Sequence, residues 1–120
     1  MRLSKNFVSS EFASPDHKAS GLMMNKEFIK KLQIARDLAG IEFVINSGFR
    51  TPEHNKKVGG KPNSAHLRGF ACDIATQSPT AKFTVLKSLI NAGFTRIGIY
   101  DNFIHCDIDP SLPSGVIWTK

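Results

Sequence analysis

Two short stretches, at residues 70–75 and 103–108, constrain the fold more than any other part of the chain. In the first, Asp73 is flanked by a cysteine and an isoleucine, and in the second, His105 is flanked by an isoleucine and a cysteine. Successive side chains of a β-strand point to opposite faces of the sheet. Each stretch therefore predicts a strand with an apolar, cysteine-bearing face toward the core and a polar side chain on the opposite face.

Helical periodicity marks two further elements. The first covers Lys26–Ala39, with Asn25 as its N-cap and Gly40 as its C-terminal stop. Its predicted apolar stripe consists of Phe28, Leu32, Ala35 and Leu38. The second begins at Ser78-Pro79, a cap followed by a first-turn proline, and ends at Gly93. Its predicted buried stripe consists of Phe83, Leu86, Leu89 and Ile90.

Three more strands are predicted. Glu42–Ser47 is short and rich in strand-forming residues, Arg96–Tyr100 precedes the 103–108 strand across a turn at Asp101-Asn102, and Val116–Trp118 adds an edge strand. Trp118 itself would either close the core or line a cleft. The elements together predict an α+β fold, with a small, mostly antiparallel β-sheet, helices packed on one face, and the polar site in a cleft.

Two segments predict little regular structure. The N-terminal arm, residues 1–22, has turn signals between isolated aromatics and is expected to pack over the rest of the domain. A long loop is predicted at Gly48–Ala65. Long connections in a small domain are uncommon and often functional.

The size and composition predict one soluble, monomeric domain covering residues 1–120. The N-terminus lacks the apolar stretch of a secretory signal, and no run approaches the roughly 18 apolar residues of a membrane span, so a cytoplasmic protein is expected as synthesised. A basic surface with a net charge of +6 suits polyanionic partners, but on charge alone the scattered lysines indicate a role in solubility. A nucleic-acid partner is not expected, because the basic residues are scattered and form no stripe with interleaved aromatics.

The two cysteines, Cys72 and Cys106, do not form the short-spaced pairs of a zinc finger and are too few for a disulfide scaffold. Strand alternation places both on the core side of their strands. We expect a buried pair of reduced thiols there, with a disulfide as the alternative in an exported protein.

Two of the four histidines are placed to bind a metal. His66 precedes Asp73 by seven residues across a turn, and His105 lies on the predicted hairpin. Two histidines and one carboxylate form a standard open zinc site, which leaves the fourth position to water or substrate. His17 and His54 have no such partners and are expected in surface or loop roles.

The segment from Ser64 to Asp73, with the pattern Ser-x-His-x-x-Gly-x-Ala-x-Asp, and the later pair His105-x-Asp107 resemble the zinc peptidases of the M15 family. That family includes D-alanyl-D-alanine carboxypeptidases, wall endopeptidases and phage endolysins, and its small, compact branch is the most similar. The ten-residue pattern is specific. Weaker similarities extend over most of the chain, at Leu3–Phe7, Glu11-Phe12, Ser47–Arg50, Asn55, Gly59-Gly60 and Gly98-x-Tyr100.

By position, the resemblance implies that His66, Asp73 and His105 bind Zn²⁺. It also implies that Arg50 holds the substrate or polarises the scissile carbonyl, since a guanidinium can pair with a carboxylate or stabilise an oxyanion. The alternative for Arg50 is a surface ion pair. Ser64 would hydrogen-bond the substrate or a ligand, or would only shape its turn. The implied reaction is amide hydrolysis by zinc-activated water.

The general base is where the chain departs from better-known members of the family. They carry a Glu, Asp or His two or three residues before the last histidine, where this chain has Asn102 and Phe103. The nearest carboxylates are Asp101, which could be only a turn residue, and Asp107, which shares a strand face with His105. Asp107 is the expected base, with orientation of a metal ligand as its alternative role.

The leading functional hypothesis is therefore a zinc-dependent hydrolase of peptide bonds in bacterial peptidoglycan. Its form would be a phage or prophage endolysin that is made in the cytoplasm and acts on the wall after release. The alternative is a zinc-binding module of the same fold that has lost catalysis, which the missing upstream base favours.

Overall fold

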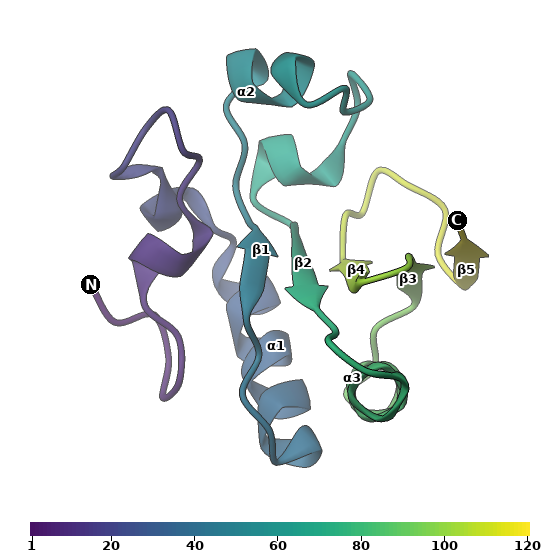
Figure 1. Ribbon diagram of the computed structural model, residues 1–120. Helices are drawn as coiled ribbons and strands as arrows, with labels where there is room; N and C mark the ends of the chain where they lie inside the picture. The colour runs from purple at the N-terminus through teal and green to yellow at the C-terminus, as the bar shows by residue number, and fades with distance from the viewer.

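The computed structural model describes all residues, 1–120, and shows an α+β arrangement (Figure 1). Five strands form one sheet in the order β1-β2-β4-β3-β5, and every neighbouring pair is antiparallel except β3 and β5. The strands are β1 (Ile45–Ser47), β2 (Ala71–Ala75), β3 (Arg96–Ile99), β4 (Phe103–Asp107) and β5 (Val116–Thr119). The predicted fold class is confirmed.

Helix α1 (Lys26–Ala39) has the predicted bounds. The Asn25 side chain accepts a hydrogen bond from the Phe28 backbone, and Gly40 ends the helix with a φ of 67°, in the left-handed region that favours glycine. The prediction that Leu38 is buried is wrong, because its side chain is 56% exposed. The buried face of α1 is instead formed by Phe28, Ile29, Leu32 and Ala35.

Helix α3 (Pro79–Asn91) begins after the predicted Ser78 cap, whose side chain accepts from Ala81. Its predicted stripe is wrong at both ends, since Phe83 is 66% and Ile90 53% exposed. The helix carries apolar residues at helical spacing on two faces, and the face around Val85 and Leu89 is the buried one.

The segment predicted as a continuous loop at 48–65 contains a helix, so that prediction is wrong. Helix α2 (Pro52–Lys57) starts with proline in its first turn, and the Thr51 side chain caps it by accepting from His54. This is the same pattern of hydroxyl cap and proline that predicted the start of α3 at Ser78. A short 3₁₀ helix, η3 (Ala65–Arg68), then leads into β2.

The alternation predicted for β2 and β4 is confirmed by their register. Cys72 pairs with Cys106, and Asp73 pairs with His105. Both cysteines have no exposed surface and belong to a core of 16 residues that also includes the buried faces of α1 and α3. The helices therefore cover the cysteine face of the sheet, and the polar face is left for the candidate site.

The N-terminal segment contributes two aromatic side chains to this core. Phe7 and Phe12 are buried and meet edge to face, with ring centroids 5.6 Å apart. Two 3₁₀ helices, η1 (Ser9–Phe12) and η2 (Ser20–Met23), give the segment more regular structure than predicted. Gly48 lies against it so closely that a Cβ there would come within 2.7 Å of Phe12.

None of the helices combines the length and apolar character that a membrane crossing needs.

We predict that a thiol reagent will detect no thiol in the native protein and two after denaturation without reductant. Cys72 and Cys106 are free and buried, with their sulfurs 3.8 Å apart, and burial raises the pKa of Cys72 well above its usual value. Buried, protonated thiols react slowly. A denatured sample with no titratable thiol would show that the pair is a disulfide instead.

Candidate metal centre

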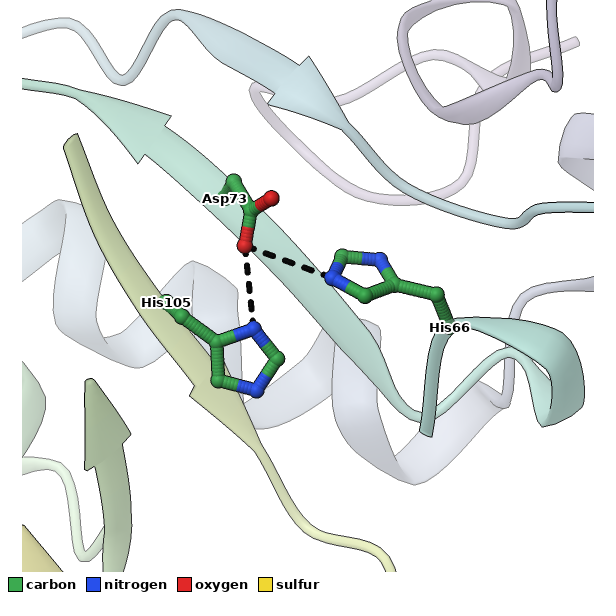
Figure 2. Close-up of side chains that lie close together, drawn as sticks. All are labelled: His66, Asp73 and His105. Carbon is green, nitrogen blue, oxygen red and sulfur yellow. Dashed lines mark hydrogen bonds and ion pairs between the residues drawn. The ribbon is translucent and has the colours of Figure 1, made fainter. Parts of the chain in front are cut away.

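The β2–β4 register brings two of the predicted metal ligands together. Because Asp73 and His105 are cross-strand partners on the face opposite the cysteines, their side chains meet directly. His105 Nδ1 lies 2.9 Å from Asp73 Oδ1, and His66 Nε2 lies 3.3 Å from the same oxygen (Figure 2). One potential ligand atom from each residue lies within 4.8 Å of the others. The three residues thus form a compact cluster that could hold one metal ion.

The third member, His66, is positioned by the 3₁₀ helix η3. The Ser64 side chain caps this helix by accepting a hydrogen bond from the His66 backbone, at 3.2 Å. Gly69 ends it with a φ of 75°, and a Cβ there would lie 2.3 Å from the carbonyl oxygen of Met23. The turn that the pattern Ser-x-His-x-x-Gly predicts is therefore a tightly confined one, and it points His66 at Asp73.

The hydrogen bonds around the two histidines leave one nitrogen of each ring for a metal. His66 Nδ1 lies 2.7 Å from the carbonyl oxygen of Gly48, an acceptor that requires a proton on Nδ1 and leaves Nε2 as the donor to a metal. His105 Nε2 lies 2.7 Å from Asp107 Oδ2, which fixes the proton on Nε2 and leaves Nδ1. Outer partners of this kind are typical of metal-binding histidines. Two imidazole nitrogens and a carboxylate are a donor set that fits Zn²⁺.

Contacts within the cluster shift the pKa of Asp73 and the pKa of His105 in opposite directions. Burial raises the pKa of Asp73, but hydrogen bonds from His105 and His66 outweigh it and hold the pKa below its ordinary value. Burial lowers the pKa of His105, but its bonds to Asp107 and Asp73 outweigh this and raise it to about 9. Without a metal, the doubly protonated ring of His105 thus donates one hydrogen bond to Asp73 and one to Asp107. A cation at the centre would replace that proton.

Asp107, the expected general base, has both carboxylate oxygens engaged. Oδ2 contacts His105, while Oδ1 accepts from Arg96 Nε at 2.7 Å and from the Asp109 backbone at 3.1 Å. Its side chain is 1% exposed. Burial raises the pKa of Asp107. Its hydrogen bonds with His105 and with the Asp109 backbone, together with the charge of Arg96, outweigh burial and hold the pKa below its ordinary value. These contacts fit the alternative role, orientation of His105, better than proton exchange with water.

Arg96 was not singled out from the sequence. It lies on β3, where alternate residues share the face of His105, because Gly98 is the cross-strand partner of His105. Strand alternation on β3, combined with this register, predicts that Arg96 lies beside Asp107. A second buried carboxylate, Asp109, is paired with Arg68 in a similar way.

Arg50 lies at the edge of the cluster. Its Nε donates to Ser47 at 3.1 Å and its Nη1 to Asn55 at 3.2 Å, while Nη2 lies 3.5 Å from Asp73 Oδ2. The guanidinium is therefore held next to a candidate metal ligand, and its side chain is 16% exposed. Gly60 makes room for this arrangement, since a Cβ there would lie 2.0 Å from Asn55 Oδ1.

The other candidates lie away from the cluster. Asp101 is exposed in the turn between β3 and β4, where its carbonyl oxygen accepts from Lys82. His17 is exposed in the N-terminal segment, and His54 lies in α2. His66, Asp73, His105, Arg50 and Asp107 are thus brought together, and Asp101, His17 and His54 are not.

The fold and the site define a small α+β protein with a two-histidine, one-carboxylate cluster of the kind found in metal-dependent hydrolases. The family model described as Peptidase M15 matches residues 5–107. The chain therefore belongs to the peptidase M15 family, which supports a metal-dependent peptidase. The matched range contains the whole cluster, together with Arg50, Ser64 and Asp107. A search of curated proteins gave no match.

We predict that the purified protein binds one divalent metal ion and that His66→Ala abolishes tight binding. His66 supplies one of only three protein donor atoms, and two remaining donors hold a metal far more weakly. The matched control is His17→Ala, which removes an exposed histidine outside the cluster. Metal content after dialysis checks both variants, and equal metal content in all three proteins would contradict the assignment.

Proposed function

We propose that this protein is a zinc-dependent hydrolase of peptide bonds in bacterial peptidoglycan. The proposal rests on the close approach of His66 Nε2, Asp73 and His105 Nδ1. The other nitrogen of each histidine is hydrogen-bonded to an oxygen, that of the Gly48 carbonyl group for His66 and that of the Asp107 carboxylate for His105. Membership of the M15 family supports peptide hydrolysis as the reaction.

The three cluster residues would hold the metal, and Zn²⁺, when bound, supplies Lewis-acid activation of water and of a carbonyl group at neutral pH. Arg50 then has two possible tasks beside it: to bind a substrate carboxylate, or to stabilise the negative charge that develops on the scissile carbonyl oxygen. Both fit a guanidinium that Ser47 and Asn55 hold in place next to Asp73. Ser64 accepts from the His66 backbone, so its own hydroxyl proton is free to donate to the substrate.

The charge distribution near the cluster supports an acidic substrate. The segment 50–68 supplies Arg50, α2 and His66, and within it Lys56, Lys57 and Lys61 are exposed, against the single acid Glu53. The other two basic residues of the segment, Arg50 and Arg68, face Asp73 and Asp109. Stem peptides of peptidoglycan carry free carboxylates, which such a segment attracts. Release at host lysis, as for a phage or prophage endolysin, is the setting we propose.

Asp107 acts in this scheme as a positioning residue, through His105. We predict that Asp107→Asn lowers metal affinity by roughly 10–100-fold as well as turnover, because it weakens the partner that orients a metal ligand. A residue that only accepted the water proton would lower turnover and leave metal affinity unchanged. Metal titration and turnover of the same preparation separate the two roles.

Asp101→Asn is the matched control for this variant, since Asp101 is exposed in the neighbouring turn. It should leave both quantities unchanged. Breaking the buried Arg96–Asp107 pair lowers the free energy of unfolding by about 3–5 kcal/mol. Melting curves must therefore show that Asp107→Asn is folded at the assay temperature. Full turnover and metal affinity in the Asp107 variant would contradict the positioning role.

A second candidate function is a zinc-binding module without catalysis. It is favoured by the contacts of Asp107, whose two oxygens are both engaged, and by the exposed position of Asp101 away from the cluster. Both carboxylate oxygens of Asp107 already have partners, and no hydrogen bond or ion pair links the Asp101 side chain to a cluster residue.

Digestion of purified peptidoglycan separates the two candidates. We predict that the zinc-loaded protein releases muropeptides, that a chelator stops the release, and that added zinc restores it. Mass spectrometry of the products identifies the bond and distinguishes a carboxypeptidase from an endopeptidase. His66→Ala serves as the inactive control. If the folded, metal-loaded protein releases no product, the result favours the zinc-binding module without catalysis.

A further inference from the structure

We infer that Asp16 positions Arg50 for its task on the substrate, by fixing the two hydroxyl groups that hold the start of α2. The inference rests on the proposed function, in which Arg50 binds a substrate carboxylate or stabilises the developing negative charge, and it adds a positioning residue to that function. Asp16 belongs to the N-terminal arm, residues 1–22, part of which packs beside β1 (purple to blue in Figure 1).

Each carboxylate oxygen of Asp16 accepts a hydrogen bond from a different hydroxyl group. Ser14 Oγ donates to Oδ1 and Thr51 Oγ1 donates to Oδ2, both at 2.5 Å. These two bonds hold the pKa of Asp16 below its ordinary value, so the side chain is a carboxylate at neutral pH. Because a carboxylate has no proton to donate, both hydroxyl groups direct their only proton at it.

The lone pairs of the two hydroxyl groups are thereby left for backbone N–H groups at the start of α2. Thr51 Oγ1 caps the helix by accepting from the His54 N–H at 3.1 Å, and Ser14 Oγ accepts from the Thr51 N–H at 3.3 Å. Ser14 has no exposed surface, and its own N–H donates to the Ser20 hydroxyl at 2.7 Å. Asp16 therefore sets the direction of two hydrogen bonds whose acceptors are both fixed.

Arg50 directly precedes the residue that is anchored in this way. The N–H groups of its neighbours, Phe49 and Thr51, both donate to the arm, that of Phe49 to the carbonyl oxygen of Phe12 at 2.8 Å. The N–H of Arg50 itself donates to the carbonyl oxygen of His66 at 3.1 Å. The backbone of Arg50 is thus held between the arm and the segment that carries a candidate metal ligand.

A second route leads from Thr51 to the guanidinium group through α2. The Asn55 N–H donates to the carbonyl oxygen of Thr51 at 2.9 Å, and the Asn55 side chain accepts from Arg50 Nη1 at 3.2 Å. Asn55 is itself buried. A shift of the first turn of α2 would therefore move Asn55, and with it one of the groups that hold the guanidinium beside Asp73.

The metal ligands are supported separately from Asp16. Gly48, whose carbonyl oxygen fixes the proton on His66 Nδ1, packs against Phe12. The hydrogen bonds of Asp16 go to Ser14 and Thr51, and none of them reaches a cluster residue. Loss of the Asp16 carboxylate should therefore disturb Arg50 and leave the candidate metal cluster in place.

The test compares Asp16→Ala with the matched control Asp37→Ala in the zinc-loaded protein. Asp37 is also an exposed aspartate that accepts a hydrogen bond, but its partners Gln33 and Lys5 lie outside the segment 48–51. The first measurement is the exchange of the Arg50 Nε–H with water, followed by NMR. Arg50→Lys, which has no Nε–H, identifies the signal by its disappearance.

In Asp16→Ala, we expect the exchange of the Arg50 Nε–H to accelerate by about tenfold, because the local hydrogen bonds that hold its backbone are lost. The Nε–H groups of Arg68 and Arg96, which donate to Asp109 and Asp107, are internal references and should keep their exchange rates. Equal acceleration at all three arginines would reflect a general loss of stability and overturn the inference. An unchanged rate at Arg50 would overturn it as well.

The second measurement is kcat/KM on a stem peptide with a free carboxyl terminus. We expect Asp16→Ala to lower kcat/KM by about tenfold or more at retained metal content, because a displaced guanidinium no longer meets its target group. Thr51→Val, which lacks the hydroxyl group, should show a loss of the same kind, and Thr51→Ser, which keeps it, should lose far less. If Asp16→Ala melts below the assay temperature, Asp16→Asn keeps one acceptor oxygen and should give a smaller loss in the same direction.

The exchange measurement keeps this inference distinct from the proposed function, because it needs no turnover. Accelerated exchange at Arg50 alone, in a protein that hydrolyses no peptide, would support the positioning role and count against the hydrolase. Hydrolysis by Asp16→Ala at the wild-type kcat/KM, with unchanged exchange at Arg50, would leave the hydrolase in place and overturn the positioning role.

Discussion

The antiparallel pairing of β2 with β4 is the interaction on which the rest of the structure depends. It sets Cys72 opposite Cys106 on the core side and Asp73 opposite His105 on the other side. Core packing and cluster geometry are therefore fixed by the same register. A one-residue shift would move every side chain of a strand to the opposite face. Burial of the cysteine face against α1 and α3 thus also holds the candidate metal ligands in place.

Around this pair, the site is built in layers of increasing distance. Gly48 and Asp107 each occupy one nitrogen of a histidine, and Arg96 in turn holds Asp107. Arg96 also lies against Trp118, so one side chain contacts both the carboxylate that orients His105 and the indole that lies beside His105. The cost of placing the Asp107 charge in the interior is offset by these partners.

Much of this arrangement could be predicted from the sequence, because strand alternation needs only a period of two. Alternation placed Asp73 and His105 on one face, and capping residues gave the bounds of α1. Helical periodicity was less decisive: α3 has apolar residues on two faces, and only packing determined that Val85 rather than Phe83 is buried. The Arg96–Asp107 contact follows from the register of the β3–β4 hairpin, whereas the bond from the Asp109 backbone to Asp107 depends on the path of the chain after β4, which alternation does not give.

The position of the two cysteines beneath the cluster has a consequence for the donor atoms that the candidate metal site can offer. Thiolates bind soft and borderline metals strongly. A chain whose β2 or β4 had slipped by one residue would offer sulfur where the native structure offers a carboxylate or an imidazole. The register that buries Cys72 and Cys106 in the core therefore also keeps sulfur ligands away from the candidate metal cluster and leaves it only nitrogen and oxygen donors.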